Sequence, residues 1–146
     1  MFNSVLVVCV GNICRSPVGE RLLAGMLPEK KIASAGVGAL VGHPADETMT
    51  SVAAGHGLSL SGHVAQQFTA DLGRQFDLIL VMEAGHKKQV LRIAPELSGR
   101  TMLFDQWTGA DGIPDPYRHP SSVHEYAYTK ISLAADAWGN KLKSHK

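Results

Sequence analysis

The sequence has few cysteines and a modest share of charged residues. Of its 146 residues only two are cysteine, Cys9 and Cys14, and both lie near the start of the chain. A pair this close together is a poor framework for a disulfide-stapled secreted fold, so another role is expected for it. Charged residues make up 18% and hydrophobic residues 45%, which excludes a disordered chain and a highly charged coiled coil.

The chain also lacks an excess of positive charge and a long hydrophobic run. Lysine and arginine total 14 against 13 acidic residues, a formal charge of +1, which argues against binding of long nucleic acids through their phosphates. The apolar run 5–10 is too short to insert into a membrane, and the start of the chain has no basic leader-like region. We therefore expect a cytoplasmic protein, of a size and charge that suit a monomer.

Strands and helices alternate in the predicted pattern. Continuously apolar, β-branched runs such as 5–10 are typical of strands buried on both faces of a parallel sheet. Apolar residues at helical spacing, ended by proline or glycine, indicate the helices between them. Strands are expected at 5–10, 32–35, 76–82 and 101–104, and helices at 16–27, 46–55, 84–93 and 121–142. The alternation predicts one doubly wound α/β domain over residues 1–146.

Two details of these helices are also predicted. Ser16 followed by Pro17 is typical of a helix start, with the serine as N-cap. In the last helix the apolar and aromatic side chains are expected in the core, namely Tyr126, Ile131, Leu133, Ala134 and Trp138.

The turn after the first strand carries the residues best suited to chemistry. Ligands of doubly wound sheets bind at the carboxyl ends of strands, and this strand runs into Cys9-Val10-Gly11-Asn12-Ile13-Cys14-Arg15-Ser16. Successive backbone N–H groups of such a loop converge on an anion, and the helix that follows adds positive potential. The planar fork of Arg15 can bind two oxygens at once. This phosphate loop, residues 9–16, is therefore expected to hold phosphate.

Cys9 is the candidate nucleophile. The positive field of the loop favours the thiolate, the form that attacks phosphorus, and Ser16 can hydrogen-bond to the sulfur. Attack produces a phosphocysteine, while the alcohol that leaves needs a proton from an acid. The sequence must supply that acid from another segment.

Asp115 is the candidate acid. It lies between two prolines in the loop 105–120, and a loop of this length in a small domain is often functional. The prolines stiffen the backbone that would carry the carboxyl group over the site. Tyr117 beside it could stack on an aromatic substrate.

Two segments resemble a known family. Val-Cys-Val-Gly-Asn-Ile-Cys-Arg-Ser-Pro at 8–17 and Asp-Pro-Tyr at 115–117 are similar to the motifs of the low-molecular-weight protein tyrosine phosphatases, and they occur in the family's order. The likeness covers essentially the whole chain. Residues 76–82, 85–86 and 93–96 look most like bacterial members paired with tyrosine autokinases of capsule or exopolysaccharide export.

The resemblance implies a fold and a function. The fold would be a three-layer doubly wound sheet of four parallel strands in the order 2-1-3-4, with helices on both faces. The activity would be hydrolysis of phosphotyrosine through a phosphocysteine intermediate, without a cofactor. The partner would be a phosphotyrosine protein, a membrane tyrosine autokinase, so that the enzyme would regulate exopolysaccharide or capsule production.

The resemblance also implies the catalytic roles. Cys9 would be the nucleophile, and Arg15 would bind the phosphate and the transition state. Asp115 would act as general acid and later as the base that activates water. Ser16 would bind the thiolate. These roles agree with those argued from the residue chemistry alone.

Supporting roles follow from the same resemblance. Asn12, helped by His63, would hold the unusual backbone of the loop, and His63 is expected to be structural rather than catalytic. Leu40 and Tyr117 would line the mouth of the site. Two positions depart from many relatives, which carry arginine where Gln66 stands and a large aromatic residue where Leu40 stands. The second departure favours the bacterial branch and a wider or shallower rim.

Several other functions compete with this hypothesis. An arsenate reductase on the same fold needs further cysteines to resolve its product, and no cysteine lies outside the loop. A sulfurtransferase needs no proton donor such as Asp115, and a non-enzymatic phosphotyrosine reader needs no nucleophile. A phosphatase for small aryl or acyl phosphates on the same fold remains an alternative.

The second cysteine and the remaining histidines are less informative. Cys14 either packs beneath the loop or forms a reversible disulfide that protects Cys9 from irreversible oxidation. The histidines show no His-x3-His or Cys-x2-Cys spacing typical of a metal site. No metal cofactor is therefore expected.

Overall fold

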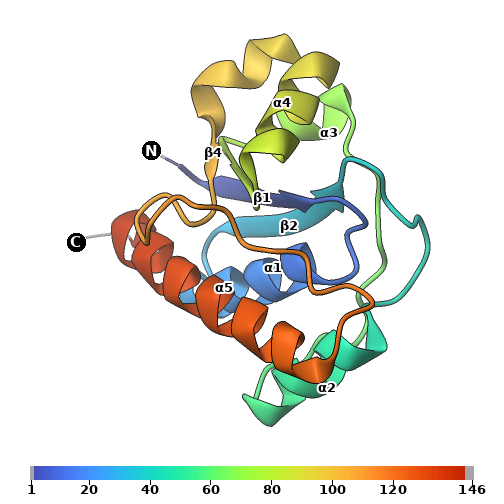
Figure 1. The fold of residues 1–146 in the computed structure, drawn as a ribbon. Coiled ribbons are helices and arrows are strands. Elements are labelled where there is room, and N and C mark those ends of the chain that lie inside the picture. The colour runs from blue at the N-terminus through green and yellow to red at the C-terminus, as the bar shows by residue number, and fades with distance from the viewer. Residues whose placement is uncertain (1, 144–146) are drawn as a thin grey trace.

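A single parallel sheet organises the molecule (Figure 1), whose computed structural model describes residues 2–143. The strands are β1 (Ser4–Cys9), β2 (Lys31–Gly36), β3 (Leu78–Val81) and β4 (Thr101–Leu103), hydrogen-bonded in the order β2-β1-β3-β4. All three neighbouring pairs are parallel. The predicted α/β fold and its strand order are confirmed.

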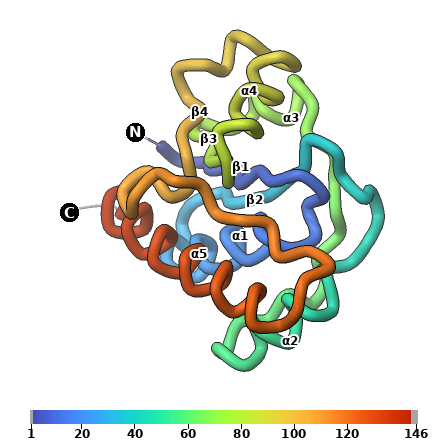
Figure 2. The backbone as a smooth tube through the Cα atoms, in the orientation of Figure 1, coloured from blue at the N-terminus to red at the C-terminus, as the bar shows by residue number. Residues whose placement is uncertain are grey.

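Helices cover both faces of this sheet. They are α1 (Arg15–Met26), α2 (Glu47–Gly55), α3 (Ala70–Arg74), α4 (Ala84–Ile93) and α5 (Ser121–Leu142), with the 3-10 helix η1 (Pro95–Arg100) between α4 and β4. Figure 2 shows α1 and α5 on one side of the sheet and α3 and α4 on the other. Parallel strands are normally buried in this way, because each crossover places a helix on a face.

β1 is the centre of the core. Its side chains alternate between the two faces, with Val5 and Val7 packed in the cluster of α1 and α5, and Leu6 and Val8 in the cluster of α3, α4 and η1. All four are fully buried. Burying each such side chain contributes about 1.5–3 kcal/mol, so this strand fixes the place from which the phosphate loop departs.

The start of α1 differs from the sequence prediction. Cys14 is the N-cap, with no side-chain hydrogen bond to the helix, so the prediction of Ser16 as N-cap is wrong. The Ser16 hydroxyl lies inside the first turn, where it contacts Cys9 and Asn12 instead. Because the Ser16 hydroxyl makes these contacts with the phosphate loop, it does not cap the helix.

The core prediction for α5 is only partly correct. Ile131, Ala134 and Trp138 are buried, whereas Tyr126 and Leu133 are each 57% exposed, so the prediction is wrong for these two. Residues 126 and 133 are two helical turns apart and therefore lie on the same face, which is turned to solvent. An isolated exposed apolar residue is normal at a protein surface.

Two short helices were not predicted. α3 has five residues and η1 has six, too few for a hydrophobic period to be visible. The Thr69 side chain, which accepts a hydrogen bond from the N–H of Leu72, caps α3. Within the described residues, no helix has the combination of length and apolar character needed to cross a membrane.

Candidate active site

A pocket with a volume of about 180 Å³ lies at the carboxyl end of β1. The phosphate loop forms part of its lining, and the other lining residues come from the segments that follow β2 and precede α5. Cys9, Arg15, Leu40, Asp115 and Tyr117, all predicted from the sequence, line this one pocket. The fold therefore brings together three segments that are far apart in the chain.

Cys9 ends β1 with its side chain buried in the pocket wall. Its Sγ lies 2.8 Å from Ser16 Oγ. Both cysteines are free, so no disulfide links Cys9 to Cys14. Val10, Gly11 and Ile13 of the loop also line the pocket.

Asn12 holds the loop in its bend. Its φ of 58° is left-handed, a conformation that costs most residues with a side chain about 1–2 kcal/mol and asparagine less, because its short polar side chain can hydrogen-bond locally. Its Nδ2 donates to Ser16 Oγ at 2.8 Å and to Ser34 Oγ at 2.9 Å, and all three side chains are buried. Buried hydrogen bonds of this kind contribute about 0.5–1.5 kcal/mol each, enough to offset the strain.

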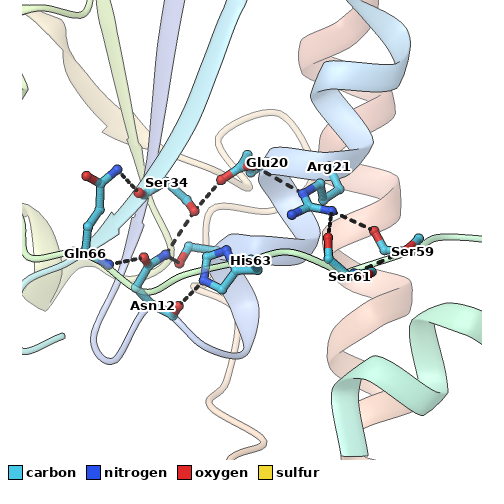
Figure 3. Close-up of polar contacts among 9 residues, drawn as sticks. Asn12, Glu20, Arg21, Ser34, Ser59, Ser61, His63 and Gln66 are labelled. Carbon is cyan, nitrogen blue, oxygen red and sulfur yellow. Dashed lines mark hydrogen bonds and ion pairs between the residues drawn. The ribbon is translucent and has the colours of Figure 1, made fainter. Parts of the chain in front are cut away.

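The segment that contains His63 and Gln66 also contacts Asn12 (Figure 3). His63 Nε2 lies 2.5 Å from the Asn12 carbonyl oxygen, and the N–H of Gln66 donates to Asn12 Oδ1 at 2.9 Å. Gln66 Nε2 also donates to the Ser34 carbonyl oxygen at 2.9 Å. Gln66 is thus part of the network.

The same network continues to the surface. Ser34 Oγ donates to Glu20 Oε1 at 2.6 Å, and Glu20 pairs with Arg21 at 3.3 Å. Arg21 donates to the carbonyl oxygens of Ser59 and Ser61 at 3.2 Å and 3.0 Å (Figure 3). These contacts join α1, β2 and the segment after α2 around the base of the phosphate loop.

Arg15 is almost completely buried at the start of α1. Its NH1 donates to Glu83 Oε2 at 2.6 Å and to the Ile113 carbonyl oxygen at 2.7 Å. Its NH2 lies 3.7 Å from Asp115 Oδ2. A buried guanidinium requires such partners, and here they fix its orientation.

Sequence reasoning did not identify Glu83. This residue lies immediately beyond β3, next to the carboxyl end of β1, and its side chain is 44% exposed. Its position after a buried strand could have indicated a site residue, because the carboxyl ends of parallel strands meet at one edge of the sheet. Only the fold shows that Arg15 is its partner.

Asp115 reaches the pocket from the loop before α5. Its Oδ1 accepts a hydrogen bond from the N–H of Tyr117 at 3.0 Å, while Oδ2 faces Arg15. The side chain is 46% exposed, so the carboxyl group lies at the boundary between the pocket and solvent. Leu40, 37% exposed, contributes apolar surface to the same pocket.

Two further titratable groups flank this site. Burial lowers the pKa of His86, and the nearby Arg15 lowers it further. His86 Nε2 lies 3.6 Å from Glu83 Oε2, and its Nδ1 has no hydrogen-bond partner in the described part of the chain. Burial raises the pKa of the Cys14 thiol, as does the negative charge of Asp46. His86 is therefore neutral at pH 7, and Cys14 is a thiol.

Residues 4–146 match the family described as low molecular weight phosphotyrosine protein phosphatase. The chain belongs to this family. Its site, a cysteine and an arginine on one loop facing an aspartate, lies at the carboxyl end of β1. Family membership supports the protein tyrosine phosphatase interpretation over the arsenate reductase alternative.

Individual relatives align over nearly the full chain. It is 56% identical over 142 residues to the probable low molecular weight protein-tyrosine-phosphatase AmsI of Erwinia amylovora, covering 97% of this chain and 99% of that protein. It is 54% identical over 141 residues to Etp of Escherichia coli, covering 97% and 95%. Among solved structures, Vibrio vulnificus Wzb in complex with benzylphosphonate superposes with a TM-score of 0.95 at 51% identity, covering 97% of this chain and 100% of that one.

Proposed function

We propose that this protein hydrolyses phosphotyrosine through a phosphocysteine formed on Cys9. The observation that carries the proposal is the convergence of Cys9, Arg15 and Asp115 on one pocket. The hydroxyl of Ser16, 2.8 Å from the sulfur, would stabilise the thiolate by donating a hydrogen bond. A nucleophile, an anion-binding group and an acid are the groups that phosphomonoester hydrolysis requires.

The reaction would proceed in two steps. In the first, the Cys9 thiolate attacks phosphorus, the P–O bond to the tyrosine breaks, and Asp115 gives its proton to the leaving phenolate oxygen. In the second, water attacks the phosphocysteine, Asp115 takes a proton from that water, and the S–P bond breaks. Inorganic phosphate leaves, and both the thiolate and the protonated acid are restored for the next cycle.

Arg15 would hold the transferring phosphoryl group. Its NH1 is bound to Glu83 and to the Ile113 carbonyl oxygen, so the guanidinium is oriented before the substrate arrives. Groups fixed in advance stabilise developing charge without reorganising during the reaction. The backbone N–H groups of the phosphate loop would bind the remaining oxygens.

The pocket favours an aryl phosphate. Leu40 and Tyr117 line it beside the phosphate loop, so a flat ring would pack between apolar groups while its phosphate reaches the loop. The ligand named for the Vibrio vulnificus relative, benzylphosphonate, has the same combination of ring and phosphorus group. We therefore place phosphotyrosine ahead of phosphoserine and of acyl phosphates.

Specificity and mechanism can be tested together. The kcat/KM for a phosphotyrosine peptide should exceed that for the same peptide with phosphoserine, and a Cys9→Ser variant should release no phosphate from either. Equal values for the two peptides would remove the tyrosine preference. A preference for small aryl phosphates over every phosphopeptide would instead favour the small-molecule alternative.

The physiological substrate we propose is phosphotyrosine on a membrane tyrosine autokinase of capsule or exopolysaccharide export. Support comes from the sequence likeness to bacterial members paired with such kinases, and from the 54–56% identity to AmsI and Etp. An Asp115→Asn protein should capture the phosphorylated kinase from extract, and vanadate, which occupies phosphate sites, should release it. Capture of unphosphorylated kinase to the same extent would contradict recognition through phosphotyrosine.

A further inference from the structure

Three side chains with metal-binding atoms meet beside the phosphate loop. They are Cys14 of the loop, Asp46 at the N-cap of α2, and His124 in the first turn of α5. Their ligand atoms all lie within 4.8 Å of one another. Cys14 and His124 are buried, and the side chain of Asp46 is only 16% exposed. Because the three come from segments far apart in sequence, their spacing gave no sign of a metal site.

The hydrogen bonding of His124 leaves one nitrogen unused. Its Nδ1 lies 3.1 Å from the Pro120 carbonyl oxygen, which can only accept, so Nδ1 carries the proton. In the neutral ring Nε2 then presents a lone pair. Within residues 2–143 that atom is buried without a hydrogen-bond partner, and it lies 3.2 Å from Asp46 Oδ2. A lone pair facing a carboxylate in the interior is unfavourable unless a proton, which would make the two groups an ion pair, or a metal cation lies between them.

The orientation of His124 is the one that metal-bound histidines adopt. Such residues commonly donate the second ring N–H to a carbonyl or carboxylate, which fixes the tautomer and the ring. The Pro120 contact supplies this support here, on the side of the ring away from Asp46 and Cys14.

Asp46 is also fixed in place. Its Oδ2 accepts a hydrogen bond from the N–H of Met49 at 3.0 Å, and its own N–H donates to the Ile13 carbonyl oxygen at 2.8 Å. The first bond ties the carboxylate to α2, and the second ties the Asp46 backbone to the phosphate loop. The donor set is therefore held by the fold.

We propose that Cys14, Asp46 and His124 bind a zinc ion, with water in the fourth position. Zinc binds cysteine sulfur, histidine nitrogen and carboxylate oxygen in tetrahedral sites, with bonds of about 2.0–2.3 Å, which place ligand atoms roughly 3.3–3.8 Å apart. The observed separations, up to 4.8 Å, need a closure of about 1.5 Å at most. Magnesium and calcium prefer oxygen alone and fit this donor set poorly.

Zinc binding would change the state of Cys14. The thiol loses its proton to solvent and forms a Zn–S bond, and the ion's two positive charges balance the thiolate and the carboxylate. Cys14 would then be unavailable for a disulfide with Cys9. The proposal does not depend on the phosphatase mechanism, because Cys9 is not one of the ligands.

The test is metal binding to the purified full-length protein. Zinc affinity would be measured by competition with a chromophoric chelator, and cobalt(II) would serve as a spectroscopic probe. We expect one ion per chain and a sulfur-to-cobalt charge-transfer band. Cys14→Ser and His124→Phe should each remove or shift the cobalt spectrum and weaken zinc binding by more than the roughly 10–100-fold typical of losing an outer-shell partner. Asp46→Asn, which keeps an oxygen for the Met49 cap, should also weaken it.

Two control variants separate this site from other metal-binding groups. Cys9→Ser tests the nucleophile, and His119→Ala tests an exposed histidine of the loop before α5. Both should bind zinc as the wild type does, and circular dichroism should show that all variants are folded. Binding lost in Cys9→Ser but kept in Cys14→Ser would overturn the proposal, as would absence of stoichiometric binding in the folded wild type.

Discussion

At the residue scale, we expect the contact with Glu83 to help position Arg15. The contact between them is short, 2.6 Å, and Arg15 is buried while Glu83 is partly exposed. Solvent therefore screens part of the ion pair and reduces its energy. What the carboxylate provides is a charge-assisted hydrogen bond that fixes one end of the guanidinium.

A Glu83→Gln variant should be a weaker enzyme. Glutamine keeps a hydrogen bond but loses the charge, a difference of about 1 kcal/mol, so kcat/KM for an aryl phosphate should fall about fivefold to tenfold. Affinity for inorganic phosphate as inhibitor should fall in parallel, because both depend on Arg15. Glu29→Gln, at an exposed position outside the pocket, is the matched control. Equal kcat/KM for the two variants would mean that Glu83 does not position Arg15.

Asp115 acts on the leaving group in our mechanism. Asp115→Asn should lower kcat/KM for phosphotyrosine by about 100-fold or more, since general acid catalysis contributes factors of that size. A substrate whose leaving group is a good anion should lose much less. Asp111→Asn, in the same loop and exposed, should leave both rates unchanged. Equal losses for good and poor leaving groups in Asp115→Asn would exclude the acid role.

At the element scale, the end of β2 is packed directly against the phosphate loop. A Cβ at Gly36 would lie 2.1 Å from the Val10 carbonyl oxygen and 3.0 Å from the Asn12 nitrogen. These are backbone atoms of the loop and cannot move aside without moving the loop itself. The absence of a side chain at this position therefore allows strand and loop to approach.

Gly36→Ala should destabilise the protein and impair phosphate binding. Overpacking typically costs about 1–3 kcal/mol, and here the displaced atoms belong to the site. Gly25→Ala is the control, because a Cβ there meets nothing within 4 Å, and the alanine should stabilise α1 by about 0.5–1 kcal/mol. Urea unfolding measures both changes. A Gly36→Ala protein with wild-type stability and phosphate affinity would contradict this packing argument.

Sequence patterns predicted some elements better than others. The bounds of α4 and α5 agree with the predictions for 84–93 and 121–142, because prolines and helical periods mark them clearly. β3 is shorter than the predicted run 76–82, since its ladder pairs only Leu78 to Val81. Apolar residues at the ends of that run are buried without joining the ladder.

At the scale of the whole molecule, site residues within one segment could be predicted from the sequence, whereas contacts between segments far apart in the chain could not. Cys9, Arg15 and Ser16 lie within one short segment, so the roles we propose for them could be inferred from the motif. Glu83 approaches Arg15 only because β3 lies beside β1, and His124 approaches Cys14 only because α5 packs near the loop. Such contacts follow from the fold, and no characteristic spacing in the sequence indicates them.

Stability should depend on pH through His86. Its pKa is lowered in the folded state by burial and by Arg15, whereas in the unfolded chain it stays near 6.5. Below that pH the unfolded chain binds a proton on His86, whereas the folded state binds this proton only at lower pH. Acid therefore favours unfolding. The stability linked to His86 is therefore fully present above about pH 6.5 and is lost as the pH falls toward the folded pKa.

The midpoint of thermal unfolding measures this effect. Between pH 7 and pH 5 the wild type should lose more stability than a His86→Gln variant, whose side chain does not titrate. His119→Gln, which replaces an exposed histidine, should keep the wild-type dependence. The same pH dependence in His86→Gln and wild type would assign the acid sensitivity to other groups.

The central claim, covalent catalysis by Cys9, is tested most directly by trapping the phosphocysteine. An Asp115→Asn protein should form the intermediate readily from an aryl phosphate with a good leaving group and hydrolyse it slowly, because the base for water is missing. After rapid quenching, mass spectrometry of the intact protein and its peptides should find one phosphoryl group, on Cys9. Turnover without any phosphoryl group on Cys9, or with it on another residue, would contradict the account.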